Sequence, residues 1–152
     1  MFDFFQKKNY TYLMKRFFGK IKNEHMLIDE SEHIHLSKVL RMKVGDKIIV
    51  NCNDEFDYYC TIESITKSQT VANVESKKEC PALPKRNIVL FQAIPKKEYF
   101  DTIIAKSIEL GVSKIQPFTS QFTVVKDVKK DRTIAQIMTA CKQCERSKLA
   151  EL

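Results

Sequence analysis

The stretch "KSIELGVSKIQPF" (106–118) has the pattern of a helix that ends at a glycine and is followed by a short strand. Gly111 stands just after the last helical residue, where a left-handed backbone costs glycine almost nothing. The segment after it has strand composition, and Pro117 predicts that this strand is short or lies at a sheet edge. The stretch therefore predicts a helix-to-strand corner in an α/β unit.

The same alternation of strand and helix continues on both sides of this corner. "NIVLFQAI" (87–94) is an apolar run of strand length, which we expect to be buried on both faces. The helix that follows it has an apolar face formed by Phe100, Ile103, Ile104 and Ile108. A last helix, from about Arg132, carries apolar side chains at helical spacing: Ile134, Ile137, Met138 and Cys141. Strands that alternate with helices predict a parallel sheet, here a small one.

The first half of the chain has a different pattern of predicted elements. "KIIVN" (47–51) reads as a strand, and "YYCTIESITKSQTVANV" (58–74) has the Thr, Val, Ile and Tyr content of a hairpin. A helix before them is predicted by an apolar stripe at Leu36, Val39 and Leu40. Several strands with one short helix predict a small, partly closed β-barrel.

A proline-containing segment, "KKECPALPKRN" (77–87), separates the two halves and has the composition of a linker. We therefore expect an α+β protein of two domains. Residues 14–80 would form the barrel, 81–86 the linker and 87–152 the α/β unit. Residues 1–13 would be an extension, and the true start is either Met1 or Met14.

Composition restricts the classes of function. The net charge of +7 and a pI near 9.1 favour a polyanionic partner. Only 3 glycines are present, which excludes glycine-rich phosphate loops and dinucleotide fingerprints from these residues. No run approaches the ~20 apolar residues of a membrane span, and the N-terminus lacks a signal-peptide pattern. Five cysteines, an odd number, then predict free thiols and a cytoplasmic location.

Basic side chains are grouped beside the predicted barrel helix. His35, Lys38 and Arg41 follow one another at i+3 steps, with Lys15, Arg16 and Lys43 nearby in the same domain. Such a group is either an RNA-phosphate patch or a solvated helix face, and both interpretations stay open. The two histidines His33 and His35 point to different faces of a helix, so they do not share a metal, and we expect both at the surface.

A second basic group lies beyond the predicted strand ends of the α/β unit: Lys96, Lys97, Lys126, Lys129, Lys130 and Arg132. Ligands of α/β sheets bind outside the carboxyl ends of the strands, so these residues suit an anionic substrate; loop solubility is the alternative. Arg146 either holds a phosphate by a bidentate contact or pairs with an acid.

Cys141 and Cys144 form a CxxC motif inside the last predicted helix. A zinc site needs a second pair of ligands, and a redox pair normally opens a helix after a strand. We expect these thiols to pack, with zinc or redox use as the alternative, and we predict no metal.

Three separated motifs resemble the bacterial small-subunit ribosomal RNA uracil-N3 methyltransferase family. They are "HIHLSKVLRMKVGD" (33–46), "QAIPKKEYFDTIIAKSIELGVSKIQPFTSQFTVV" (92–125) and "TACKQCERSKLAEL" (139–152). The chain departs from the family pattern at Phe122, where the family has an arginine, and around residues 139–146, where two acids and a glycine differ. Gln143 and Arg146 match the pattern.

The resemblance implies a PUA-like RNA-binding barrel followed by the leading part of a SPOUT methyltransferase domain without its knot. It implies S-adenosylmethionine-dependent methylation of uracil N3 in small-subunit ribosomal RNA, and a homodimer for the full-length protein. The cofactor site is expected beyond Leu152, so the chain alone is expected to be inactive. Gln143 and Arg146 are the expected active-site residues. The RNA-binding candidates are Lys15, Arg16, His35, Lys38, Arg41, Lys43, Lys96 and Lys97. The alternative is a non-catalytic RNA-binding protein of PUA-like fold.

Overall fold

The computed structural model describes residues 14–121, 123 and 127–152. The chain divides into two compact units, the first ending at Glu79 and the second covering Cys80–Leu152. The division lies one residue before the barrel end expected from the sequence. Cys80 belongs to the second unit, where it is buried and its thiol donates to the carbonyl oxygen of Glu145 at 3.2 Å.

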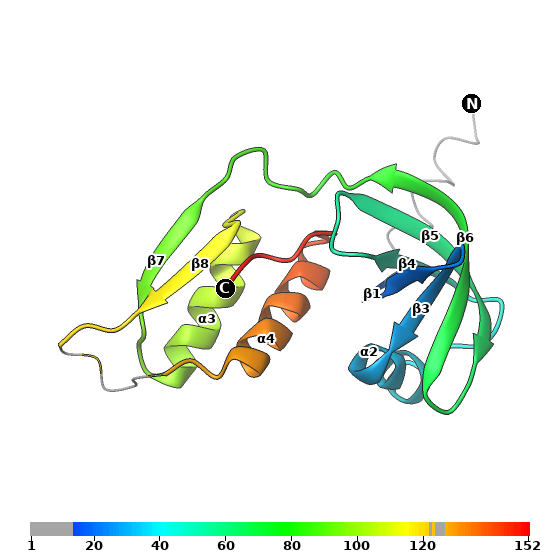
Figure 1. Cartoon of the computed structure of the whole chain (residues 1–152), viewed down its shortest axis with the longest axis horizontal. Coiled ribbons are helices and arrows are strands. Elements are labelled where there is room, and N and C mark those ends of the chain that lie inside the picture. The colour runs from blue at the N-terminus through cyan, green and yellow to red at the C-terminus, as the bar shows by residue number, and fades with distance from the viewer. Residues whose placement is uncertain (1–13, 122, 124–126) are drawn as a thin grey trace. The chain divides into compact units, whose positions relative to one another are not determined.

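The first unit is a curled six-stranded sheet (Figure 1) with the order β1-β4-β5-β6-β3-β2. The strands are β1 (Lys15–Phe18), β2 (Lys20–Lys22), β3 (His25–Asp29), β4 (Lys47–Asn51), β5 (Phe56–Ile65) and β6 (Gln69–Glu79). Strand β1 pairs in parallel with β4, and the other neighbours are antiparallel. The hairpin expected over 58–74 is confirmed as β5 and β6.

The curl of this sheet has two visible causes. The β5–β6 ladder has register shifts at Tyr59/Cys60 and Ile62/Ser64, and bulges of this kind bend and twist a sheet. Gly19, between β1 and β2, permits a close approach, because a Cβ there would lie 2.7 Å from the carbonyl oxygen of Leu27. The curled sheet encloses a core that includes Phe17, Met26, Ile28, Leu36, Ile48, Val50, Cys60 and Ile62.

The helix of this unit is more irregular than the apolar stripe predicts. A short α2 (Glu30–Ile34) continues into a π-helical turn at His35–Val39, closed by a hydrogen bond from the Leu40 N–H to the His35 carbonyl. The extra residue in that turn rotates the stripe. Leu36 is fully buried, Leu40 is half-buried and Val39 is 64% exposed, so the expected core position of Val39 is wrong.

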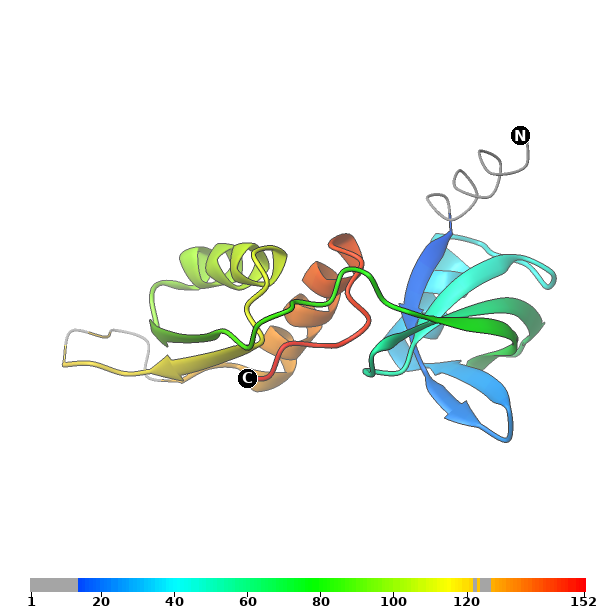
Figure 2. The same ribbon diagram turned by 90° about the horizontal axis from the view of Figure 1, so that it is seen from above.

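The second unit contains β7 (Val89–Ala93), α3 (Lys97–Glu109), β8 (Lys114–Phe118) and α4 (Lys130–Gln143). The two strands pair in parallel, as predicted (Figures 1 and 2). Gly111 has φ +93°, which confirms the left-handed helix end read from the sequence. The main chain of Glu151 also pairs with β8, through hydrogen bonds to Ile115 and Ser113.

The core of this unit lies between its helices and one face of the sheet. Phe100, Ile104 and Ile108 of α3 are buried, as the helical spacing predicts. The expectation that β7 is buried on both faces is wrong, because Val89 is 41% and Phe91 70% exposed. Leu90 and Ile115, which are register partners, point to the covered face, so the described residues cover only one side of this two-stranded sheet.

Candidate functional site

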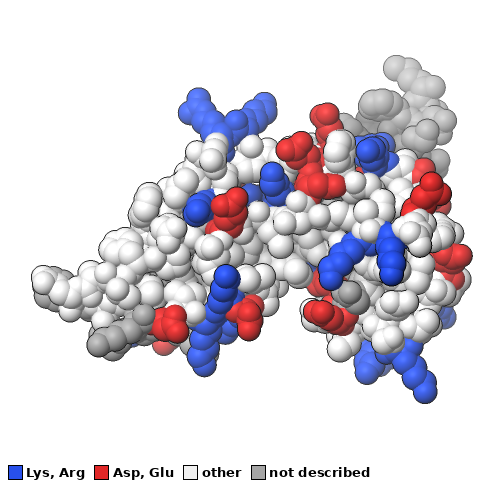
Figure 3. Space-filling model, viewed as in Figure 1, with Lys and Arg blue, Asp and Glu red and all other residues white. Residues whose placement is uncertain are grey.

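Exposed basic side chains follow α2 in the first unit. His35 and Lys38 lie on the π-helical turn, and Arg41 follows it in a left-handed conformation with φ +53°. All three are exposed, as are Lys43 and Lys15. We call these five residues the cationic group; Figure 3 shows how Lys and Arg side chains project from the surface in one view. Their exposure is what contact with a phosphate backbone requires.

Arg16, predicted to join this group, has a different environment. Its Nη1 and Nη2 donate to the two carboxylate oxygens of Asp57 at 2.7 and 3.0 Å, and its side chain is only 9% exposed. A bidentate pair of this kind fixes the guanidinium between β1 and β5. The expectation that Arg16 faces a nucleic acid is therefore corrected: in this structure it is part of the sheet's own packing.

His33 is also corrected from a surface to an interior position. It is 3% exposed, and its Nδ1 lies 2.9 Å from the Thr70 hydroxyl of β6, so it joins α2 to the sheet. The surface expectation holds for His35. Residues two apart on a helix point about 200° away from each other, so His33 can face the sheet while His35 faces solvent.

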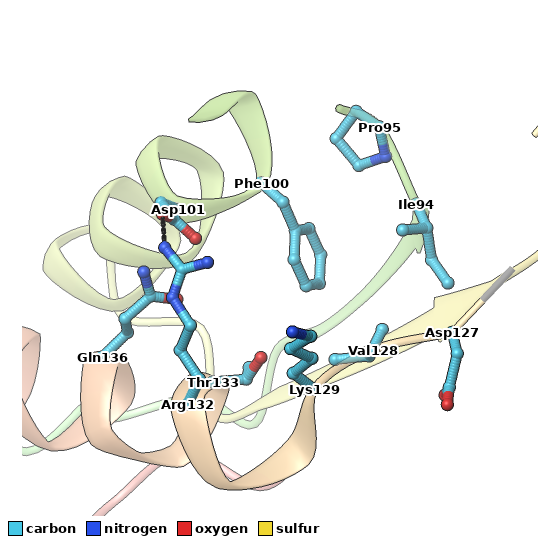
Figure 4. A pocket seen from close by; sticks show the side chains of 10 residues that line it. All are labelled: Ile94, Pro95, Phe100, Asp101, Asp127, Val128, Lys129, Arg132, Thr133 and Gln136. Atoms are coloured by element: carbon cyan, nitrogen blue, oxygen red, sulfur yellow. Dashed lines mark hydrogen bonds and ion pairs between the residues drawn. The ribbon is translucent and has the colours of Figure 1, made fainter. Parts of the chain in front are cut away.

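The second unit contains a cavity of about 220 Å³ at the carboxyl end of β7 (Figure 4). Its apolar wall is formed by Ile94, Pro95 and Val128 with the ring of Phe100, which is 6% exposed. Its polar lining is Asp101, Asp127, Lys129, Arg132, Thr133 and Gln136. Helix α3 supplies one side and the start of α4 the other.

Arg132 and Asp101 face each other across the two helices. The Arg132 Nη2 forms an ion pair with the Asp101 Oδ2, and their side chains remain 39% and 31% exposed (Figure 4). These two residues and Gln136 also line a more open groove of about 330 Å³ that runs along α3 and α4 to Thr139 and Gln143. The cavity and the groove therefore share one charged boundary.

Some predicted site residues of this unit lie at the groove and others at the cavity. Gln143 is exposed and lines the groove, and Lys96 is exposed next to the cavity wall. The side chain of Lys97, and the whole of Lys126 and Phe122, lie outside the described residues. Lys129 and Arg132, which the sequence placed beyond the strand ends, line the cavity itself.

Arg146 is buried rather than exposed, at 4%. Its Nη1 donates to the carbonyl oxygens of Ile108 at 3.3 Å and Val112 at 2.8 Å, on either side of the Gly111 corner. The guanidinium therefore satisfies carbonyls at the end of α3, which a cation does favourably. This placement corrects the expectation of an Arg146 that meets a phosphate or an acid. Its Nε has no partner among the described residues.

The CxxC thiols are packed side chains in this structure. Cys141 is fully buried and Cys144 half-buried, and burial raises the pKa of both thiols. A raised pKa reduces the thiolate fraction that metal binding and disulfide exchange require. The described ranges contain no group of three or more His, Cys, Asp or Glu side chains suited to a metal ion. No described helix has the length and hydropathy of a membrane span.

Sequence reasoning missed two parts of this site. No role for Asp101 is predicted from the sequence, and Phe100 is placed only in the apolar face of its helix. The signal for their role is the loop "IPKK" (94–97), which ends β7 and begins α3. Residues just after a parallel strand lie where α/β sheets bind ligands, and this rule applies to Phe100 and Asp101 as well as to the lysines.

Comparison with known proteins follows the same division of the chain. Residues 81–152 match the model of an RNA methyltransferase domain, and residues 28–75 match the model of an RNA methyltransferase PUA domain. Ribosomal RNA small subunit methyltransferase E of Buchnera aphidicola (subsp. Acyrthosiphon pisum) is 32% identical over 135 residues, covering 81% of this chain and 51% of that protein. The Bacillus subtilis protein of the same name is 31% identical over 121 residues, covering 74% and 46%.

Solved structures agree with these matches. A crystal structure of a predicted RNA methyltransferase from Thermotoga maritima superposes with a TM-score of 0.81 at 26% identity, covering 90% of this chain and 64% of that one. Ribosomal RNA small subunit methyltransferase E from Neisseria gonorrhoeae, bound to S-adenosylmethionine, gives 0.78 at 25% identity, covering 90% and 59%. The chain spans about half the length of the curated relatives it matches.

Proposed function

The chain belongs to the RNA methyltransferase family that combines a PUA domain with a methyltransferase domain, and on this premise we propose that its protein methylates uracil N3 in small-subunit ribosomal RNA. The observation that carries the proposal is the order of the two units. Residues of the curled sheet match the model of an RNA methyltransferase PUA domain, and the strand–helix–strand–helix unit that follows matches the model of an RNA methyltransferase domain. A solved structure of a ribosomal RNA small subunit methyltransferase E superposes over 90% of the chain.

The proposed division of labour follows from the two units. The first is a PUA-like module whose cationic group contacts the RNA backbone through Lys15, His35, Lys38, Arg41 and Lys43. These contacts position the RNA without reading its sequence. The second is the leading part of a SPOUT domain, in which Lys96 and Gln143 face the RNA. Arg16 and Arg146 have no part in RNA contact in this proposal, because Asp57 holds the Arg16 guanidinium and Arg146 is buried.

S-adenosylmethionine, which is bound in the Neisseria structure, is the methyl donor in the proposal. The cavity next to Phe100 does not fit the whole cofactor. Its volume of about 220 Å³ is below the ~300–1,000 Å³ of pockets that enclose ligands of that size. None of the three glycines lines it, so no glycine-supported loop brings backbone N–H groups to a ligand there. The proposal for these 152 residues therefore concerns RNA contacts, and the chain alone is expected to transfer no methyl groups.

The full-length protein is proposed to act as a homodimer on the small ribosomal subunit in the cytoplasm. The test uses small subunits from a strain without the endogenous enzyme, with labelled S-adenosylmethionine. The full reading frame of the gene is expected to produce 3-methyluridine in digested ribosomal RNA, measured by mass spectrometry. The 152-residue chain is expected to bind the RNA and to leave it unlabelled. Methylation at another atom, or label incorporated by the chain alone, would contradict the proposal.

A second candidate is a non-catalytic RNA-binding protein. It is favoured by the small cavity and by the exposed cationic group, neither of which requires a methyl donor. The same experiment separates the two: RNA binding without 3-methyluridine from the full reading frame would select this alternative.

A further inference from the structure

We propose that the exposed face of the β7–β8 sheet is a protein-docking surface. Its partner is the part of a methyltransferase domain that this chain does not contain, and the face binds that part even when it is a separate polypeptide. The inference rests on membership of the family and does not require uracil N3 to be the methylated atom. It goes beyond the proposed function, because it assigns a protein partner to the second unit and names the residues that bind it.

The exposed face is apolar. Register partners in a parallel pair share a face, so Val89, Phe91 and Ala93 of β7 lie on the same side as their partners in β8, which include Gln116 and Phe118. Val89 is 41%, Phe91 70% and Phe118 45% exposed. Within the described part of the chain, the helices of this unit cover the other face only. Three large apolar side chains are therefore presented together to whatever meets this face.

An uncovered face is unusual for a sheet of this kind. Parallel strands occur almost only in sheets whose two faces are both covered, and a sheet usually has about four to six strands. The outer edge of β7 has no strand partner among the described residues. The outer edge of β8 is paired where the main chain of Glu151 meets it, at Ser113 and Ile115. The sheet is therefore open to further polypeptide on one face and along the edge of β7.

The charge on this face does not suit a nucleic acid. The two strands contain one charged residue, Lys114, and its Nζ lies 3.7 Å from a carboxylate oxygen of Glu151. A phosphate backbone is bound by exposed cations, which this face does not supply. An exposed apolar patch instead marks a surface for another protein segment.

The basic residues that flank β7 disfavour a second copy of this chain as the partner. Lys85 and Arg86 precede the strand and Lys96 follows it, and all three are exposed. A two-fold axis that paired β7 with β7 of another copy would bring the start of each strand beside the end of the other. The like charges would then face each other and repel.

Comparison with the relatives indicates the partner. This chain covers 51% and 46% of the two curated relatives described above, and 64% and 59% of the two solved structures. Those proteins therefore contain polypeptide in addition to the two units of this chain. Because the uncovered apolar face belongs to the unit that matches the methyltransferase domain, we assign that additional polypeptide to it.

The experiment uses a fusion that can be cut. The 152-residue chain is joined, through a protease site after Leu152, to the C-terminal part of the Bacillus subtilis relative that lies beyond the match. After cleavage, size-exclusion chromatography shows whether the two pieces stay together. We expect them to elute as one complex. Hydrogen exchange of the amides at 88–93 and 114–118 should be slower in that complex than in the 152-residue chain alone.

Substitutions on the face test which residues hold the complex. Phe91→Lys and Val89→Lys should each weaken association by roughly tenfold or more, because a lysine buried without a partner is costly. Leu110→Lys, at a position 81% exposed and outside the two strands, is the matched control and should leave association unchanged. All three positions are exposed in the chain alone, so circular dichroism of the 152-residue variants should match that of the wild type.

Several results would overturn the inference. Pieces that separate after cleavage, or a Phe91→Lys complex as stable as the wild type, would contradict it. A fusion that does not fold, when the relative itself does, would show that the face does not fit this partner. Self-association of the chain that Phe91→Lys abolishes would make a second copy the occupant, and slower exchange of the same amides with ribosomal RNA would make RNA the occupant.

The outcomes for the inference and for the proposed function are separable. Pieces that stay together, with no 3-methyluridine formed by the full reading frame, would leave this inference standing and contradict the proposed function. Formation of 3-methyluridine by the full reading frame, with pieces that separate, would do the reverse.

Discussion

Arg16 and Asp57 form a bidentate ion pair between β1 and β5, with N···O distances of 2.7 and 3.0 Å and side chains 9% and 2% exposed. Asp57 also accepts from the amide of Asn51 at 2.8 Å. Two charges removed from water in this way depend on each other, so the pair contributes to the integrity of the sheet and is not available to a ligand.

Arg16→Ala is expected to destabilise the first unit by about 3–5 kcal/mol, because it leaves the Asp57 carboxylate buried without its cation. The measurement is urea unfolding followed by a probe in the sheet. Lys15→Ala, at the neighbouring exposed position, is the control and should change stability by less than ~0.5 kcal/mol. If Arg16→Ala instead weakened RNA binding at unchanged stability, Arg16 would return to the RNA-contact set.

Arg146→Ala is expected to loosen the corner between α3 and β8. The change removes the donor for the Ile108 and Val112 carbonyls, at a cost of about 1–3 kcal/mol. Hydrogen exchange over residues 107–116 should report the loss of protection. Gln143→Ala, exposed in the groove, should leave that exchange unchanged. Unaltered exchange in the Arg146 variant would argue against a structural role.

Replacing Lys38, Arg41 and Lys43 together with glutamine should reduce the salt dependence of RNA binding. Each phosphate contact to single-stranded RNA contributes about 0.7 to the slope of log K against log salt, so three contacts contribute about 2. Fluorescence anisotropy across a salt series measures the slope. Lys67→Gln, a single exposed lysine in the β5–β6 turn, is the comparison and should lower the slope by no more than the share of one contact, about 0.7. An equal slope for the wild type and the triple variant would show that the cationic group is only solvated.

The thiols should react slowly. Burial raises the pKa of Cys60 to about 12 and also raises the pKa of Cys141 and Cys144. A raised pKa means less thiolate at any pH below it, so at pH 8 alkylation by iodoacetamide should be slower at all three than for free cysteine. Mass spectrometry of timed samples gives the rates, and denatured protein should react like free cysteine. Faster reaction at Cys141 or Cys144 would support the redox alternative.

Local patterns in the sequence predicted most of the elements. The Gly111 corner, the β5–β6 hairpin and the buried face of α3 follow from glycine conformation and from hydrophobic period. The basic residues beyond the strand ends also predicted part of the cavity, namely Lys129 and Arg132. These features depend on residues that are close together in the sequence, so they can be predicted without a structure.

The sequence by itself thus determined the strands and helices from about residue 30 onward, the boundary near Cys80 and the positive charge available for a polyanion. Only the tertiary structure decided which basic side chains are exposed to a ligand and which are held by other groups of the protein. Arg16 meets Asp57 across 41 positions of sequence, and Arg146 meets Val112 across 34. The Asp101–Arg132 pair likewise joins two helices. Whether a charged side chain packs inside the protein or stays at the surface depends on partners far away in the chain. A local sequence pattern does not identify those partners.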